Sequence, residues 1–334
     1  MFLKIYRINH PVIILLIFVL AVAIWSLAFL KAPLYEFSEL DFEMPIYYWI
    51  YNLVSPYPLF SRMLSFGIIL IQAGLLNRLN NRYFLLESRT YLPSLLFILI
   101  CSIFPLQNLH PIIFSNLFLL ISIDKIFSTY RNEDRWSNYF DSGILISIAS
   151  LFYIKYSYLL IIVWFSLFIL RPFRGREWLL TVIGFILPYL FVVTYFFVFE
   201  ENVNYKIHIY FNQLFNFNST FQYNYIFYAY FIIMAFFTTL SSFRILATLR
   251  KQKVSVRRFF QVFFWLFLIS VILFAISGFS EPSFLSVSAI SLSFLFSNYL
   301  LNVKSNFWKE IIFTLFFGVA VLFQLFYYTD IIKF

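Results

Sequence analysis

The chain has 334 residues, of which 62% are hydrophobic and 12% are charged. Soluble globular domains are roughly 45–50% apolar and about 25% charged, so this composition excludes a soluble fold and predicts a protein that lies in lipid. The formal net charge of +9 does not indicate nucleic-acid binding, because lysine and arginine gather in the cytoplasmic loops of membrane proteins. We therefore expect membrane lipids, and no nucleic acid, among the partners.

About eleven apolar segments are predicted to span the membrane. Crossing the hydrocarbon core takes about 20 apolar residues, and runs near that length recur along the chain. The segments are 11–30, 61–77, 91–106, 111–129, 142–154, 157–171, 178–199, 224–243, 259–277, 284–302 and 309–329. The first apolar run is longer than the roughly 7–15 residues of a signal peptide, so we expect an uncleaved anchor. We predict an all-α, polytopic integral membrane protein with one transmembrane domain over residues 1–334.

The loops predict an orientation for these segments. We split the run from 142 to 171 at Lys155, because a charge is costly at mid-membrane and tolerated at the tip of a hairpin. With the N-terminus in the cytoplasm, most of the 24 lysines and arginines fall in inner loops. The exceptions are Lys31, Arg62, Lys155, Lys206 and Lys333. This bias favours a cytoplasmic N-terminus.

The first outer loop, residues 31–60, carries the strongest candidate for a catalytic site. Its acids precede Pro45–Val54, where a proline in the first turn and a Tyr/Trp-rich run predict a short helix in the membrane interface. Carboxylates just above a bilayer can act as a general base, a metal ligand or an attractor of cations. We take Asp41 and Glu43 as catalytic candidates and Glu39 as a substrate-binding candidate. The alternative is a solvated acidic surface, which outer loops tolerate freely.

Two further outer positions are candidates for binding substrate. His110 lies in a short hairpin before Pro111, where it could contact an anionic or hydroxylated substrate or simply cap the next helix. Lys155 and Tyr156 lie at the tip of the middle helix pair. An ammonium group in such apolar surroundings needs a partner or an anion such as phosphate, unless it reaches the interface along its own side chain.

The predicted inner loops contain two strongly basic stretches. They are Arg171–Arg176 and Arg244–Arg258. Such stretches attract anionic lipid headgroups, but the preference of inner loops for basic residues accounts for most of their charge.

The order of these parts resembles the GT-C superfamily, multi-pass glycosyltransferases that use polyprenyl-phosphate-linked sugars. Three stretches carry the resemblance: the acidic loop and helix from Glu36 to Val54, the outer turn and helix from Phe104 to Ile126, and the paired helices from Ile146 to Arg174. The outer turn has Ser115 and Asn116 where several members place an acid. The resemblance covers about residues 1–200 as a GT-C-like core, with 201–334 as additional transmembrane helices.

The resemblance implies a mechanism and a donor substrate. Asp41, or else Glu43, would deprotonate or orient an acceptor hydroxyl, while Lys155 or His110 would stabilise the departing polyprenyl phosphate. The family's first-loop acid can also bind metal, so the resemblance leaves a divalent ion open as a cofactor. The Phe/Ile/Tyr/Asn-rich composition also resembles an uncharacterised family of multi-pass inner-membrane proteins from Bacteroidetes. We therefore expect the bacterial inner membrane, with the N-terminus in the cytoplasm.

Two other functions fit the sequence. A transporter or flippase for a lipid-like or anionic substrate would show inverted-repeat symmetry and a polar cavity at mid-membrane. A non-catalytic membrane subunit would present an apolar lateral surface, with small-residue contacts to a membrane protein partner. An outward cavity bordered by Asp41 or Glu43 would favour the glycosyltransferase over both.

Overall fold

A computed structural model describes most of the chain. The described residues are 10–30, 44–87, 89–102, 107, 109–132, 136–172, 174–199, 203–215, 252–277, 282–303 and 305–328. Every regular element in these ranges is helical, which confirms the all-α prediction. Five of the described helices are long and apolar enough to cross a membrane. The chain is therefore a helical membrane protein.

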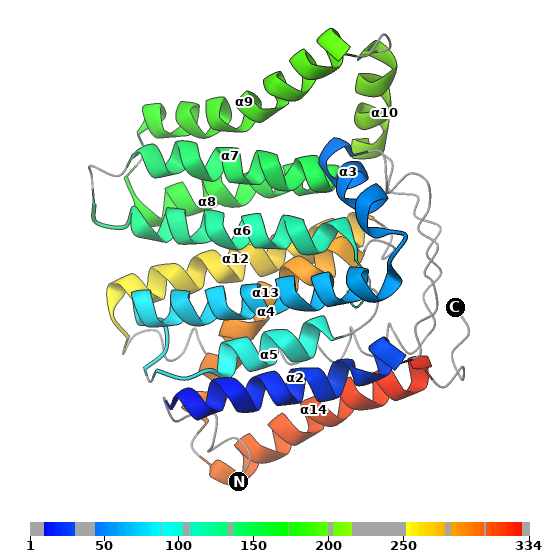
Figure 1. The fold of residues 1–334 in the computed structure, drawn as a ribbon. Helices are drawn as coiled ribbons and strands as arrows, with labels where there is room; N and C mark the ends of the chain where they lie inside the picture. The colour runs from blue at the N-terminus through cyan, green and yellow to red at the C-terminus, as the bar shows by residue number, and fades with distance from the viewer. Residues whose placement is uncertain are drawn as a thin grey trace.

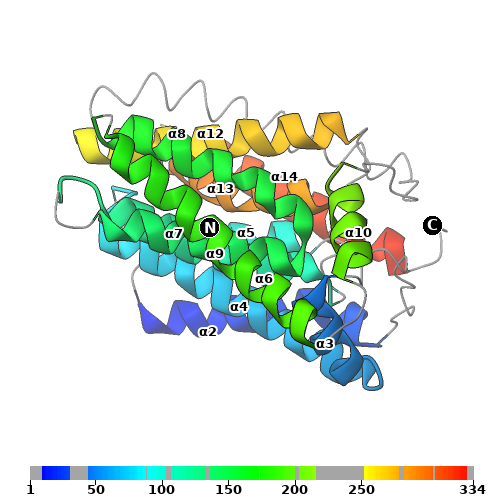
Figure 2. The ribbon, with the colours of Figure 1, turned by 90° about the horizontal axis from the view of Figure 1, so that it is seen from above.

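Several of the described helices pack on the helix that precedes or follows them in the chain, and others pack on helices far apart in the sequence. In chain order they are α2 (Pro11–Leu30), α3 (Pro45–Val54), α4 (Pro58–Tyr83), α5 (Leu92–Cys101), α6 (Pro111–Ser128), α7 (Ser137–Phe152), the 3₁₀ helix η3 (Ile154–Leu159), α8 (Leu160–Leu170), α9 (Gly175–Phe199), α10 (Val203–Phe215), α12 (Val254–Ile276), α13 (Pro282–Asn302) and α14 (Asn306–Tyr328). Figure 1 shows the long helices running back and forth between two ends of the bundle. Figure 2 shows α8 and α12 side by side along one edge, with α2 at the opposite edge.

The two ends of the bundle differ in charge. We call the end where α3 and α10 lie the α3 end, and the opposite end, where α7, α9 and α12 begin, the basic end (Figure 1). The described lysines and arginines lie toward the basic end, except Arg62, Lys155 and Lys206. This separation matches the division of loops predicted from the sequence.

The predicted spans agree with the helices in position more closely than in length. Ten of the eleven overlap described helices, and 224–243 lies outside the described residues. The predicted break at Lys155 is confirmed, because α7 ends at Phe152 and η3 turns the chain into α8. Within the described part of the segment 91–106, the helix is the ten-residue α5. The number of membrane crossings therefore stays a prediction.

The centre of the bundle is built around α5 and α13. Every residue of α5 is buried, and α13 is the most deeply buried of the five long apolar helices. Phe294 of α13 stacks on Phe263 of α12, with ring centroids 4.5 Å apart. Ser293 and Ser297 of α13 are also buried, and each hydroxyl donates to a backbone carbonyl within the helix. Small side chains of this kind let helix backbones approach closely.

Two glycines bring α7 and α9 into close contact. A Cβ atom at Gly143 would lie 2.4 Å from the carbonyl oxygen of Thr181, and one at Gly184 would lie 2.4 Å from that of Phe140. No side chain fits at such a distance from a backbone atom. Both glycines therefore set the separation of the two helices.

Candidate functional site

An apolar pocket of about 370 Å³ lies at the α3 end. Its walls come from the start of α3, the end of α7, η3, α9 and α10. The lining residues are Met44, Pro45, Leu151, Ile154, Ser157, Phe185, Ile186, Tyr189, Val192, Val193, Phe196, Tyr210, Phe211 and Leu214. We call it the lateral pocket. Because its lining is almost wholly aliphatic and aromatic, it suits a hydrocarbon chain.

The sequence of α9 explains why a pocket forms there. Gly184 holds the first half of α9 against α7. One turn later Pro188 lies inside the helix, and it cannot donate to the carbonyl of Gly184 as another residue would. Figure 1 shows α9 diverging from α7 toward its C-terminal end, where α10 lies beside it. The pocket occupies the space between the diverging helices.

The helix predicted at Pro45–Val54 is confirmed as α3, and it forms part of the pocket wall. Tyr47 is fully buried, and its hydroxyl donates to the carbonyl of Leu109 at 2.7 Å. On the other face Trp49 is 66% exposed. One face of α3 therefore packs on the bundle, and the other carries the aromatic side chains typical of a membrane interface.

The three acidic candidates, Glu39, Asp41 and Glu43, lie outside the described residues. The described chain resumes at Met44, which is buried and lines the lateral pocket. Their catalytic and substrate-binding roles stay predictions. In the described part of the chain, no three His, Cys, Asp or Glu side chains gather as a metal site requires.

His110 is placed as a helix cap. It precedes α6, is buried, and its Nδ1 accepts the backbone N–H of Ile112 at 3.2 Å. Burial lowers the pKa of His110 to about 3, so the imidazole is neutral at physiological pH. A neutral imidazole can hydrogen-bond a substrate but adds no positive charge beside a phosphate.

Tyr156 is fixed in the protein interior by its hydroxyl. The hydroxyl donates to Oδ1 of Asn116 at 2.8 Å and lies 3.4 Å from Oγ of Ser286. Tyr156 and His110 both pack against Tyr153, since the centroid of each ring lies about 6 Å from that of the Tyr153 ring. The side chain of Tyr156 therefore joins η3 to α6 and α13.

Lys155 is buried, and it lies in the chain between two residues that line the lateral pocket. Lys155 belongs to η3. Ile154, which precedes it in the chain, and Ser157, two residues after it, both line the pocket. Nearby, the hydroxyl of Tyr158 donates to the carbonyl of Leu214 at 2.7 Å and holds η3 against α10. The tip of the hairpin is thus part of the pocket wall, and the substrate-binding role of Lys155 stays a prediction.

Sequence reasoning missed the contribution of α10 to the pocket. Residues 203–215 fall between the predicted spans 178–199 and 224–243, yet they form a helix whose Tyr210, Phe211 and Leu214 line the pocket. The signal is present in the sequence: with Ile207 these three residues repeat at the i, i+3, i+4, i+7 spacing of an apolar helix face.

The helices and the pocket define a multi-pass membrane protein with an apolar lateral site. Residues 49–334 match DUF6427, a family of unknown function, and the chain belongs to this family. No curated protein and no solved structure matches the chain.

Proposed function

We propose that this member of DUF6427 transfers sugar from a polyprenyl-phosphate carrier, with the GT-C-like organisation that the sequence resembles. One observation carries the proposal: the wall of the lateral pocket begins at Met44-Pro45, directly after Asp41-Phe42-Glu43 in the chain. An apolar pocket whose wall directly follows an acidic stretch of the sequence fits a ligand with a hydrocarbon tail and a sugar-phosphate head.

The proposed chemistry is the displacement of the carrier phosphate by an acceptor hydroxyl. Asp41, or else Glu43, takes the proton of that hydroxyl while its oxygen bonds to the anomeric carbon. The bond between that carbon and the phosphate oxygen breaks, and the phosphate leaves with the electron pair. Lys155 stabilises its charge, and Glu39 binds the sugar. A divalent ion held by the same acids is a further part of the proposal.

His110 and Tyr156 support the site by position rather than by charge. Because the imidazole of His110 is neutral and caps α6, its part in the proposal is to hold the turn on which Tyr47 of α3 is anchored. Tyr156 fixes η3, and with it Lys155, against Asn116 of α6. Substitution of either is expected to act through the placement of α3 or η3.

We further propose that the protein lies in a bacterial inner membrane, with its N-terminus and basic end in the cytoplasm. This orientation is supported by the position of the described arginines and lysines, most of which lie at one end of the bundle. The lateral pocket then faces the outer side, where lipid-linked sugars and acceptors would meet.

Lipid binding is tested by filling the pocket. The variant V192W places an indole in the pocket wall, and L190W is its control because Leu190 lies on the same helix, is 60% exposed and does not line the pocket. We expect native mass spectra of the protein in mild detergent to show a bound polyprenyl phosphate. The adduct should be lost in V192W and kept in L190W. Only ordinary phospholipid adducts in the unsubstituted protein would contradict the proposal and favour a non-catalytic subunit.

Catalysis is tested separately with isosteric acid variants. D41N and E43Q should abolish release of sugar from a polyprenyl-phosphate-sugar while the lipid adduct remains, and E36Q is the control from the same loop. Sugar release that persists in the D41N/E43Q double variant would show that these acids are not catalytic. A retained lipid without any sugar release in the unsubstituted protein would contradict transfer and favour a flippase.

A further inference from the structure

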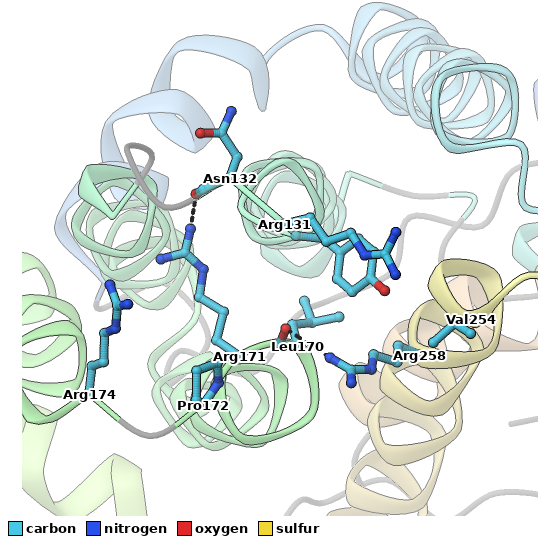
Figure 3. A pocket seen from close by; sticks show the side chains of 9 residues that line it. Arg131, Asn132, Leu170, Arg171, Pro172, Arg174, Val254 and Arg258 are labelled. Carbon is cyan, nitrogen blue, oxygen red and sulfur yellow. Dashed lines mark hydrogen bonds between the residues drawn. The ribbon is translucent and has the colours of Figure 1, made fainter.

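A second pocket, of about 210 Å³, lies at the basic end. It is formed by the turn after α6, the segment between α8 and α9, and the start of α12. The lining residues are Tyr130, Arg131, Asn132, Leu170, Arg171, Pro172, Arg174, Val254 and Arg258. Figure 3 shows Arg131 and Arg258 on one side of Arg171 and Arg174 on the other. Four of the nine lining residues are therefore arginines.

Arg171 is a fixed part of the pocket wall. It is buried, and its Nη1 donates to Oε1 of Glu177 at 2.5 Å. Its Nε and Nη2 donate to the carbonyl of Thr129 at 3.1 and 2.9 Å, and Nη2 also donates to the carbonyl of Asn132 (Figure 3). These bonds hold the turn after α6 against the end of α8. Because its charge is matched by Glu177, Arg171 shapes the pocket without adding net charge to it.

Arg131 and Arg258 are held around a single aromatic ring. Their guanidinium carbons lie 5.5 and 5.7 Å from the centroid of Tyr130, and Nη1 of Arg258 donates to the carbonyl of Leu170 at 3.2 Å. Arg131 has a φ of +56°, a conformation that residues other than glycine seldom adopt. The turn thus places Arg131 in the same pocket wall as Arg258 at a conformational cost.

Neither of these two arginines has a carboxylate partner among the described residues. Other cations at the basic end do: Arg82 pairs with Asp124 at 2.8 Å, and Lys125 pairs with Asp141 at 2.8 Å. Two guanidinium groups on one ring repel each other, and a shared anion would remove that repulsion. A guanidinium fork matches the geometry of phosphate oxygens, which it binds through two parallel hydrogen bonds.

We propose that the pocket at the basic end binds a phosphate group, gripped by Arg131 and Arg258. The pocket is several times larger than the roughly 30 Å³ that one water molecule occupies in the liquid, so a tetrahedral anion fits. Leu170 and Val254 on its wall suit the apolar part of a phosphate ester. The phosphate belongs either to a lipid headgroup or to a free phosphate compound. This site is at the opposite end from the lateral pocket and does not depend on the proposed glycosyl transfer.

The test compares R131A/R258A with R89A in the full-length protein. Arg89 is a matched control because it is exposed, lies at the same end and packs over the ring of Phe84 at 5.6 Å without lining the pocket. Phosphatidylglycerol and phosphatidylcholine probe the headgroup in native mass spectra, and inorganic pyrophosphate probes the free ion by calorimetry. We expect phosphatidylglycerol or pyrophosphate binding to weaken roughly thirtyfold in R131A/R258A and to stay unchanged in R89A.

The two probes separate the sources of the phosphate. Loss of phosphatidylglycerol alone identifies a lipid headgroup, and loss of pyrophosphate alone identifies a soluble phosphate. R131K/R258K keeps both positive charges but lacks the planar guanidinium groups, so it should bind phosphate more weakly than the unsubstituted protein. It replaces the alanine variant in the test if that variant does not fold. Equal binding of both probes to R131A/R258A and R89A, or adducts with phosphatidylcholine as strong as those with phosphatidylglycerol, would overturn the proposal.

Discussion

The two ends of the bundle use their polar side chains in opposite ways. At the α3 end, His110, Tyr47 and Tyr156 are buried and bonded within the protein, and the open pocket beside them is apolar. At the basic end, one buried ion pair fixes the loops, while Arg131 and Arg258 line an open pocket. The role of a polar residue in this membrane protein therefore depends on which partners its side chain has.

Removing the acid of the buried ion pair should have the largest effect. In E177A the guanidinium of Arg171 would stay buried without its carboxylate, which costs about 3–5 kcal/mol of stability. Thermal unfolding in detergent should show a large fall in the midpoint. R171M/E177L removes both charges and should recover much of the loss. A midpoint for E177A equal to that of the unsubstituted protein would mean that the pair does not fix the loops.

Adding one methyl group between α7 and α9 should be next in size. G184A places a Cβ atom 2.4 Å from the carbonyl oxygen of Phe140, so the helices must separate at a cost of about 1–3 kcal/mol. G74A is the control, because a Cβ there meets nothing within 4 Å and alanine favours the helix. The midpoint should fall in G184A and be unchanged or raised in G74A. Equal midpoints in the two variants would contradict the close contact of α7 with α9 at Gly184, beyond which the lateral pocket lies.

Removing one hydroxyl from the α3 end should have a smaller effect. Y156F leaves Oδ1 of Asn116 buried without the hydroxyl that donates to it, which costs about 1–2 kcal/mol. Y48F is the control, since Tyr48 is half-exposed on α3. Unfolding midpoints of the two variants provide the measurement. If Y156F were as stable as Y48F, the interior role of the Tyr156 hydroxyl would be wrong.

Near neutral pH the smallest effect comes from the protonation of His110, and this effect grows as the pH falls. Burial lowers the pKa of His110 from 6.5 to about 3, so below pH 6.5 the unfolded chain takes up a proton that the native imidazole does not. Stability should therefore fall as the pH drops from 6.5 toward 3, by at most about 1.4 kcal/mol per pH unit. H110N keeps a residue that caps helices well but has no group that titrates in this range. The unfolding midpoint of H110N should depend less on pH over that window. A parallel pH dependence in both proteins would contradict the assignment.

The sequence predicts these features unevenly, for physical reasons. Proline and aromatic patterning locates α3, and the cost of a charge in lipid locates the break at Lys155. Hydropathy ends the second predicted span at residue 77, but α4 continues to Tyr83, because Asn80 bonds to the carbonyl of Thr90 and stays buried. Such a bond depends on a tertiary partner.

The site was harder to predict than the helices. The basic stretch from Arg171 to Arg176 follows the general bias of inner loops, so its sequence does not separate a paired arginine from an open one. The pairing of Arg171 with Glu177 depends on the turn between α8 and α9. The lateral pocket likewise depends on the two glycines and Pro188 acting together, which no single local pattern reveals.

The complete burial of α5 has a consequence for how the protein is made. Its neighbours include α13 and α14, which are synthesised about two hundred residues later. The carbonyl of Ser102, at the end of α5, accepts a hydrogen bond of 2.7 Å from Nε2 of Gln324 in α14. In a nascent chain, α5 therefore lacks part of its final neighbours until α14 has been synthesised. Assembly of the centre is consequently a late event of biogenesis, and a chain that stops before α14 should be a substrate for membrane quality-control proteases.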